Sequence, residues 1–168
     1  MNGLRQLYQE LVLDHGQNPR NLRVIADCDG TNGCHHRDGH NPLCGDKLTL
    51  YLKTDGVTVE DLSFEGSGCA IFTASSSMLT EALKGKPVAD AQSLMQEFLS
   101  MVTGGLESSA ESNLGKLQVF KGVKDFPARV KCATLPWRAL ESIWASLGSP
   151  ELQGSPQLVV NSNDDKLG

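Results

Sequence analysis

Apolar residues recur at helical spacing in several stretches of the chain. In residues 3–15 they fall at intervals of three and four, which predicts an amphipathic helix ending at Asn18-Pro19. We expect this helix to pack on the body of the domain; the alternative is a partner-docking helix with Tyr8 exposed. The same spacing predicts further helices over 70–84, 88–103 and 114–121.

A shorter period marks the strands. Residues 47–53 alternate, with three leucines on one face, and residues 57–64 follow with a similar pattern. Between them, Thr54-Asp55-Gly56 is a hairpin signal. The polar stretch 34–40 is predicted as an edge strand or loop with solvated histidines. The fold class is therefore α+β: a small antiparallel sheet of about three strands with helices packed on one face.

Size and charge narrow the picture. A chain of 168 residues with 39% hydrophobic residues suits one domain, which we assign to 1–148, followed by a flexible C-terminal tail over 149–168. The net charge of −5, without a basic run, argues against a nucleic-acid partner. No apolar run approaches the roughly 20 residues that span a membrane. The N-terminus lacks a signal pattern, so we expect a cytoplasmic protein.

The chain has five cysteines, and a reducing cytoplasm favours free thiols or metal ligands over disulfides. Cys28 and Cys34 lie close to His35, His36 and His40 in the sequence. Imidazole and thiolate are both zinc ligands, so a second metal site is conceivable here. Solvated histidines on a polar segment are the preferred interpretation.

The candidate chemistry is concentrated in Asn41-Pro42-Leu43-Cys44-Gly45-Asp46. Gly45 allows a bend that points the Cys44 thiol and the Asp46 carboxylate at one spot, and both groups bind zinc. Cys44 precedes the first strand of the predicted hairpin and Cys69 follows the second. A hairpin brings those two ends together, which is the physical reason to link the two cysteines.

A third cysteine completes the candidate ligand set. Pro136 is tolerated only in the first turn of a helix, which predicts a helix start near 132–135 and places Cys132 at its N-terminus. Cys69 likewise precedes the helix predicted from residue 70. Helix N-termini favour thiolate over thiol. We therefore predict that Cys44, Asp46, Cys69 and Cys132 bind one metal ion; the alternative is ordinary buried cysteines.

Four motifs together resemble the SufU branch of the IscU/NifU-like iron–sulfur cluster assembly family. They cover residues 4–147 in matching order. The motifs are Leu7-Tyr8-Gln9-Glu10 with Asp14-His15 and Asn18-Pro19-Arg20-Asn21; Asn41-Pro42-Leu43-Cys44-Gly45-Asp46; Phe64-Glu65-Gly66-Ser67-Gly68-Cys69-Ala70-Ile71; and Phe126-Pro127-Ala128-Arg129-Val130-Lys131-Cys132-Ala133-Thr134-Leu135.

The resemblance implies a function. It implies that Cys44, Asp46, Cys69 and Cys132 hold Zn²⁺. It also implies that the protein accepts persulfide sulfur from a SufS-type cysteine desulfurase. Downstream Fe–S scaffold proteins are further candidate partners. Cys44 would be the acceptor thiol, released when the partner supplies a histidine, and Arg129 would stabilise the released thiolate. Scaffold-type IscU proteins carry a histidine where this chain has Lys131.

Three functions compete at this stage. The leading hypothesis is a zinc-dependent sulfurtransferase. The alternative is a scaffold that holds a transient Fe–S cluster on the same thiolates, against which Lys131 counts. The third is a structural zinc module, which the aspartate ligand disfavours because structural sites are mostly built from cysteine and histidine.

Overall fold

The computed structural model describes residues 2–104, 113–148 and 157–159. Most of residues 105–113, which join two of the predicted helices, lie outside this part of the chain, as do most of the residues predicted as a C-terminal tail. The elements, in chain order, are α1 (Asn2–Gln17), β1 (Cys34–Asn41), β2 (Asp46–Thr54), β3 (Val59–Ser67), α2 (Ala70–Leu83), α3 (Val88–Thr103), the 3₁₀ helix η1 (Gly115–Asp125), α4 (Pro127–Gly148) and β4 (Gln157–Val159).

The sheet is built around the predicted hairpin. β2 pairs antiparallel with β3 and, on its other side, with β1, and the sheet order is β3-β2-β1-β4. The polar stretch 34–40 forms the regular strand β1, paired with β2 along its whole length. β4 adds a short parallel pairing on the outer side of β1, a strand that the sequence did not predict.

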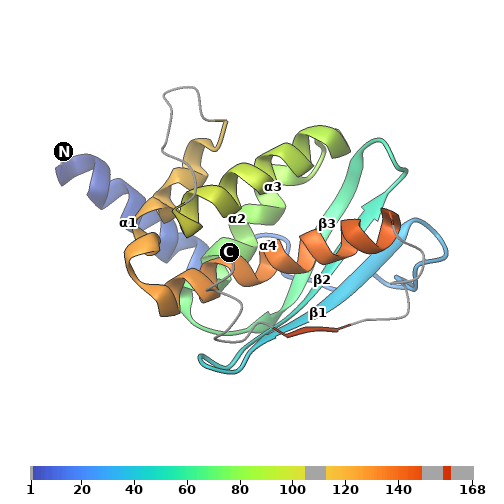
Figure 1. Ribbon diagram of the computed structural model, residues 1–168, viewed down its shortest axis with the longest axis horizontal. Helices are drawn as coiled ribbons and strands as arrows, with labels where there is room; N and C mark the ends of the chain where they lie inside the picture. Colours follow the sequence, from blue (N-terminus) through green and yellow to red (C-terminus); the bar gives the residue numbers. More distant parts are fainter. Residues whose placement is uncertain (1, 105–112, 149–156, 160–168) are drawn as a thin grey trace.

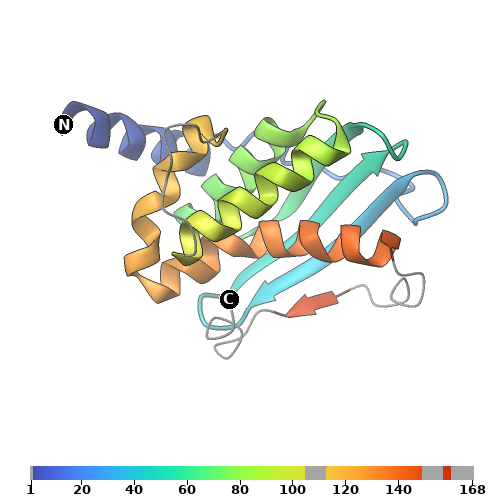
Figure 2. The same cartoon turned by 45° about the horizontal axis from the view of Figure 1, so that its top comes forward.

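The two faces of the sheet differ. The alternating leucines of β2 are at most 3% exposed and face the helices. Figures 1 and 2 show α2, α3 and α4 over this face, with α1 at one end of the molecule. The predicted α+β architecture with helices on one face is confirmed. Among the described residues, no helix is both long enough and apolar enough to cross a membrane.

α4 differs from its prediction. It begins at Pro127 rather than near 132–135, and it continues through Pro136. Proline at the first helical position is favourable, and Pro127 takes that role. Pro136 leaves the carbonyl of Cys132 without its helical N–H partner. Tertiary packing outweighs this cost, because α4 carries Trp137, which is fully buried and stacks on Phe98 at 4.1 Å between ring centroids.

A group of hydrogen-bonded polar residues, the His15 seam (His15, Arg20 and Ser77), fixes α1 to α2. His15, only 1% exposed, places Nδ1 2.6 Å from the Ser77 hydroxyl, which also accepts a hydrogen bond from the Arg20 backbone N–H at 2.8 Å. Leu11 and Val12 of α1 pack on the core as predicted. Leu7, expected on the same face, is 61% exposed. The side chain of Tyr8 lies outside the described part, so its exposure stays a prediction.

The His15 seam predicts a pH-dependent stability. Burial lowers the pKa of His15 below its ordinary value of 6.5, with Arg20 adding to the effect. The unfolded chain therefore takes up the proton first as pH falls. The stabilisation is complete above about pH 6.5 and is lost as pH falls through the folded pKa, at a rate of at most about 1.4 kcal/mol per pH unit.

Chemical denaturation of His15→Gln and of the wild type from pH 7.5 to 5 measures this effect. We expect the free energy of unfolding of the wild type to fall more steeply over this range. His36→Gln, which alters an exposed ring, serves as the control and should follow the wild type. If the free energies of unfolding of the wild type and of His15→Gln fall in parallel with pH, the buried His15 is not the source of the pH dependence.

Candidate metal centre

Cys44 lies at the tip of the turn between β1 and β2. The turn is closed by Gly45, whose N–H donates to the carbonyl of Asn41 at 2.8 Å. Gly45 has φ 71°, in the left-handed region that glycine tolerates best. The Asn41 side chain accepts a hydrogen bond from Leu43 N at 3.2 Å. This geometry leaves Cys44 exposed and turns Asp46, the first residue of β2, completely inward.

Asp46 is held from two sides. Its Oδ1 accepts a hydrogen bond from Cys69 N at 3.0 Å, and its Oδ2 accepts one from Asn41 Nδ2 at 3.5 Å. Gly68 makes this close approach feasible, because a Cβ there would clash with Asp46 Oδ1 and lie 2.7 Å from Phe72 Cδ2. The sequence therefore needs glycine at position 68 to bring the Cys69 N–H to the carboxylate.

Cys69 forms the N-cap of α2, as predicted from the sequence. Its sulfur accepts a hydrogen bond from Phe72 N at 3.4 Å. A hydrogen bond from Cys132, helped by the Phe72 N–H, lowers the pKa of Cys69 to about 6, against the opposing effect of burial. These contacts favour the thiolate form of Cys69, the form that binds metals.

Cys132 lies inside α4 rather than at its N-terminus, so the helix-pole argument for this residue is wrong. The side chain is 3% exposed, and its Sγ donates to Cys44 Sγ at 3.4 Å. The hydrogen bond to Cys69 and burial raise the pKa of Cys132. Without a metal ion, Cys132 is therefore the thiol that keeps its proton and shares it with its neighbours.

The structure brings three of the four predicted ligands together. Donor atoms of Cys44, Asp46 and Cys132 all lie within 4.8 Å of one another, although Cys132 is 88 positions from Cys44 in the sequence. Cys69 is not part of this mutual group but contacts both Cys132 and Asp46 through hydrogen bonds. In the described part of the chain, no other set of three histidine, cysteine or carboxylate side chains is this close.

The donor set fits a divalent metal ion. Two thiolates bound to one tetrahedral zinc at about 2.3 Å lie roughly 3.7 Å apart, close to the 3.4 Å between Cys44 and Cys132 sulfurs. Asp46 is a fully buried carboxylate whose hydrogen-bond donors, Cys69 N and Asn41 Nδ2, are both neutral. A buried charge is costly unless it is paired, and a cation held by the sulfurs would supply the opposite charge.

A groove of about 1440 Å³ opens beside this cluster, between α1, η1 and the start of α4. Arg129 borders it, one helical turn before Cys132, with its guanidinium 4.9 Å from the centre of the Phe126 ring. Phe126 and Leu13 on its walls are 51% and 54% exposed. Sequence patterns did not reveal this groove, because its walls come from α1, the start of α2, η1 and α4.

The structure argues against the alternative of a second metal site near Cys28 and Cys34. Cys28 and Cys34 are joined by a disulfide, so the expectation of free thiols for all five cysteines is wrong. The turn between them has positive φ at Gly30 and Gly33, which brings the two Cα atoms to 4.8 Å. His36 is exposed and its Nδ1 is hydrogen-bonded to the Cys28 carbonyl at 2.8 Å.

Comparison with known protein families agrees with the site that the geometry indicates. The profile of the NifU-like N terminal domain matches residues 7–133, which include all four candidate ligands. The chain belongs to the NifU-like N-terminal domain family.

Two relatives of this chain carry names that describe different functions. The zinc-dependent sulfurtransferase SufU of Bacillus subtilis is 45% identical over 138 residues, covering 82% of this chain and 89% of that protein. The iron–sulfur cluster assembly scaffold protein IscU of Streptococcus pyogenes is 40% identical over 141 residues, covering 84% of each chain.

Solved structures of NifU-like proteins match the fold. A candidate iron–sulfur cluster assembly scaffold protein of the SUF system from Fervidobacterium islandicum superposes with a TM-score of 0.70 at 34% identity, covering 82% of this chain and 96% of that one. A NifU-like protein from Brucella abortus gives a TM-score of 0.71 at 24% identity, covering 86% and 96%, and supports the fold alone.

Proposed function

We propose that this NifU-like protein is a zinc-dependent sulfurtransferase of iron–sulfur cluster assembly, which accepts sulfur from a SufS-type cysteine desulfurase in the cytoplasm. The single observation that carries the proposal is the arrangement of the thiols. Cys44 is exposed at the tip of a turn, beside a large groove, while its neighbours Asp46 and Cys132 are buried. The 45% identity to a protein named as such a sulfurtransferase supports it.

Cys44, Asp46, Cys69 and Cys132 would hold the zinc ion. When bound, zinc keeps thiols deprotonated at neutral pH and does not change its redox state. Cys44 is the acceptor: its thiolate attacks the terminal sulfur of the partner's persulfide, a new S–S bond forms on Cys44, and the partner's cysteine leaves as a thiolate. Cys44 suits this role because it is exposed at the tip of a turn, whereas Cys132 is buried and the exposed Cys69 accepts the Phe72 N–H hydrogen bond as the N-cap of α2.

Arg129 is proposed to stabilise the anionic sulfur during this exchange. It lies at the border of the groove, with its guanidinium over Phe126. We expect Arg129→Gln to lower sulfur transfer about tenfold, the loss of one charge-assisted contact, while zinc content stays unchanged. Arg138→Gln, further along α4 and paired with Glu141, is the matched control. Equal rates for Arg129→Gln and wild type would remove Arg129 from the mechanism.

The alternative function is a scaffold on which an Fe–S cluster is assembled. Its support is the 40% identity to the Streptococcus pyogenes IscU scaffold. Lys131 argues against a scaffold, because scaffold-type IscU proteins carry a histidine at this position, directly before the third cysteine. The Lys131 side chain is 4% exposed. Anaerobic reconstitution with iron and sulfide, followed by transfer to an apo-ferredoxin, separates the two. The third reading, a purely structural zinc module, is disfavoured by the exposure of Cys44.

The deciding experiment combines two measurements. Metal analysis of purified protein should give close to one zinc per chain. Addition of this protein should then increase turnover of a SufS-type cysteine desulfurase, measured as alanine released from cysteine. Zinc content without any stimulation would leave the structural reading standing and refute the sulfurtransferase.

A further inference from the structure

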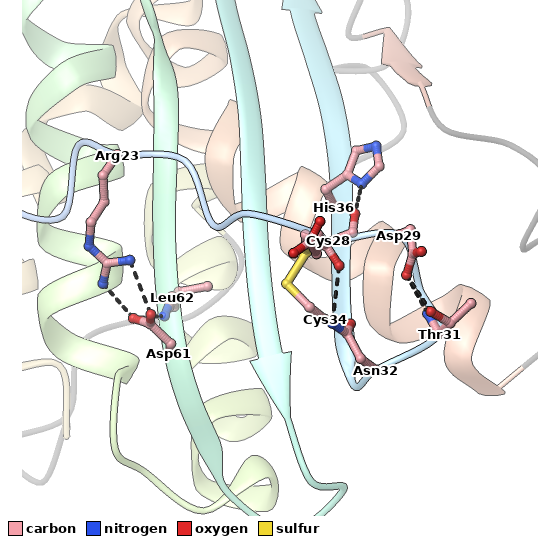
Figure 3. The surroundings of a disulfide bond; sticks show 10 residues. Arg23, Cys28, Asp29, Thr31, Asn32, Cys34, His36, Asp61 and Leu62 are labelled. Atoms are coloured by element: carbon pink, nitrogen blue, oxygen red, sulfur yellow. Dashed lines mark hydrogen bonds and ion pairs between the residues drawn. A yellow bond between two sulfur atoms is a disulfide. The ribbon is translucent and has the colours of Figure 1, made fainter.

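A strap crosses the face of the sheet that the helices leave open. We define the strap as residues 23–33, between α1 and β1. Figure 3 shows it running from Arg23 beside β3, in front of β2, to Cys28 beside β1. None of the four candidate metal ligands lies in this segment, and two of the five cysteines are joined at its far end.

The near end of the strap is tied to β3 by non-covalent bonds. Arg23 N donates to the Phe64 carbonyl at 2.8 Å, and Phe64 N donates to the Asn21 carbonyl at 3.0 Å. The Arg23 guanidinium makes two hydrogen bonds to Asp61, at 2.6 and 3.1 Å. A bidentate arginine–carboxylate pair fixes orientation as well as distance. This end is therefore held without any contribution from the disulfide.

The far end is tied to β1 by a covalent bond. Cys28 is linked to Cys34, the first residue of β1. The intervening turn adds backbone hydrogen bonds: Gly30 N donates to the Cys34 carbonyl at 2.8 Å, and the Gly33 carbonyl accepts from Thr54 N at 2.8 Å. These bonds hold the turn itself. Cys28, the end of the crossing segment, is joined to β1 by the disulfide and by the hydrogen bond between its carbonyl and His36 Nδ1 at 2.8 Å.

The disulfide is also part of a small apolar cluster. Cys28, Cys34 and Tyr51 are buried together, with Ile25 packed against them, on the face opposite the main core. Tyr51 is 7% exposed, and its hydroxyl donates to Glu65 at 2.7 Å. Val24, in the middle of the crossing, is 54% exposed. The cover over Tyr51 thus depends on the far end of the strap staying in place.

We propose that Cys28 and Cys34 form a reversible redox site, reduced by dithiols, that releases the far end of the strap. A thiolate of the dithiol attacks Cys28, which is 9% exposed against 1% for Cys34. The Cys28–Cys34 bond breaks, and Cys34 leaves as a thiolate that takes up a proton. The second thiol of the reductant, deprotonated, attacks its partner sulfur and releases Cys28; two electrons pass to the protein and the reductant becomes a disulfide.

This site is independent of the metal centre and of the proposed sulfur transfer. Cys34 and Asn41 are the two ends of β1, and they pair with Lys53 and Asp46 respectively. Seven steps along a strand correspond to roughly 23 Å. Reduction should therefore loosen the strap while the cluster around Cys44 keeps its metal ion.

The test uses the full-length, zinc-loaded protein in buffers of reduced and oxidised dithiothreitol with excess zinc. Acid quenching, alkylation and peptide mass analysis give the fraction of Cys28 and Cys34 that is reduced. Hydrogen exchange of the strap amides is measured in the same samples. We expect an intact disulfide in oxidising buffer, two alkylated cysteines in reducing buffer, and exchange at residues 24–29 about tenfold faster after reduction.

Two variants sharpen the test. Cys28→Ser/Cys34→Ser should exchange rapidly in every buffer. Arg23→Gln should loosen the near end equally in both redox states and leave the redox dependence at the far end intact. The proposal is overturned if both cysteines are alkylated in the most oxidising buffer, if exchange is the same before and after reduction, or if the double serine variant exchanges as slowly as the oxidised wild type.

Discussion

Replacing Cys44 with alanine is expected to abolish stimulation of the cysteine desulfurase, with at least a hundredfold loss of sulfur transfer, roughly the loss of the attacking nucleophile. Of the other thiols in the cluster, Cys132 is 3% exposed, and the exposed Cys69 has its sulfur engaged by the Phe72 N–H as the N-cap of α2. The measurement is alanine release by the desulfurase, together with mass analysis for a persulfide on Cys44.

The fold should survive this change, because Cys44 is exposed at a turn and lies outside the core. Thermal unfolding therefore separates loss of chemistry from loss of structure. Cys28→Ala/Cys34→Ala removes the two disulfide-bonded cysteines at the other end of β1 and controls for loss of cysteine in general; it should keep the stimulation. A Cys44→Ala protein that still stimulates the desulfurase would sink the sulfurtransferase assignment.

Gly68→Ala is expected to lower zinc affinity by about ten- to a hundredfold, the range found when groups that orient metal ligands are disturbed. The added Cβ would clash with Asp46 Oδ1 and approach Phe72 Cδ2 to 2.7 Å. Neither neighbour can give way easily, because both side chains are completely buried. The carboxylate must then turn away or the Cys69 N–H must lose its hydrogen bond.

Competition with a chromophoric chelator measures the zinc affinity of this variant, and thermal unfolding of the metal-free protein should show a loss of about 1–3 kcal/mol from overpacking. Gly148→Ala is a matched control, since a Cβ at the end of α4 has no neighbour within 4 Å. Unchanged affinity in Gly68→Ala would mean that Asp46 does not contribute to metal binding.

The sequence predicted those parts of the fold whose determinants are local. The hairpin of β2 and β3 follows from alternating leucines on either side of a turn, and α3 occupies the predicted residues 88–103. Cys69 at the N-terminus of α2 follows from the glycines before it. A hairpin brings its two open ends together, and in the structure the Cys69 N–H at one end donates to Asp46 at the other at 3.0 Å.

Predictions failed where long-range packing decides. Pro136 predicts a helix start near 132–135, yet α4 begins at Pro127 and continues past Pro136, because burial of Trp137 against Phe98 stabilises it. The approach of Cys132 to Cys44 depends on how α4 crosses the sheet, which periodicity does not encode. The Cys28–Cys34 bond depends on the geometry of the turn between Gly30 and Gly33, which the redox state of a compartment does not predict.

The composition of β1 has a consequence for solubility. An outer strand with open N–H and C=O groups is a template on which other molecules can add, and long apolar strands in this position lead to aggregation. β1 is histidine-rich and charged, and β4 pairs with three of its residues, Asp38, Gly39 and His40. Two features therefore oppose the addition of another strand at this edge of the sheet: the hydrophilic side chains of β1, and its pairing with a strand from the protein's own C-terminal region.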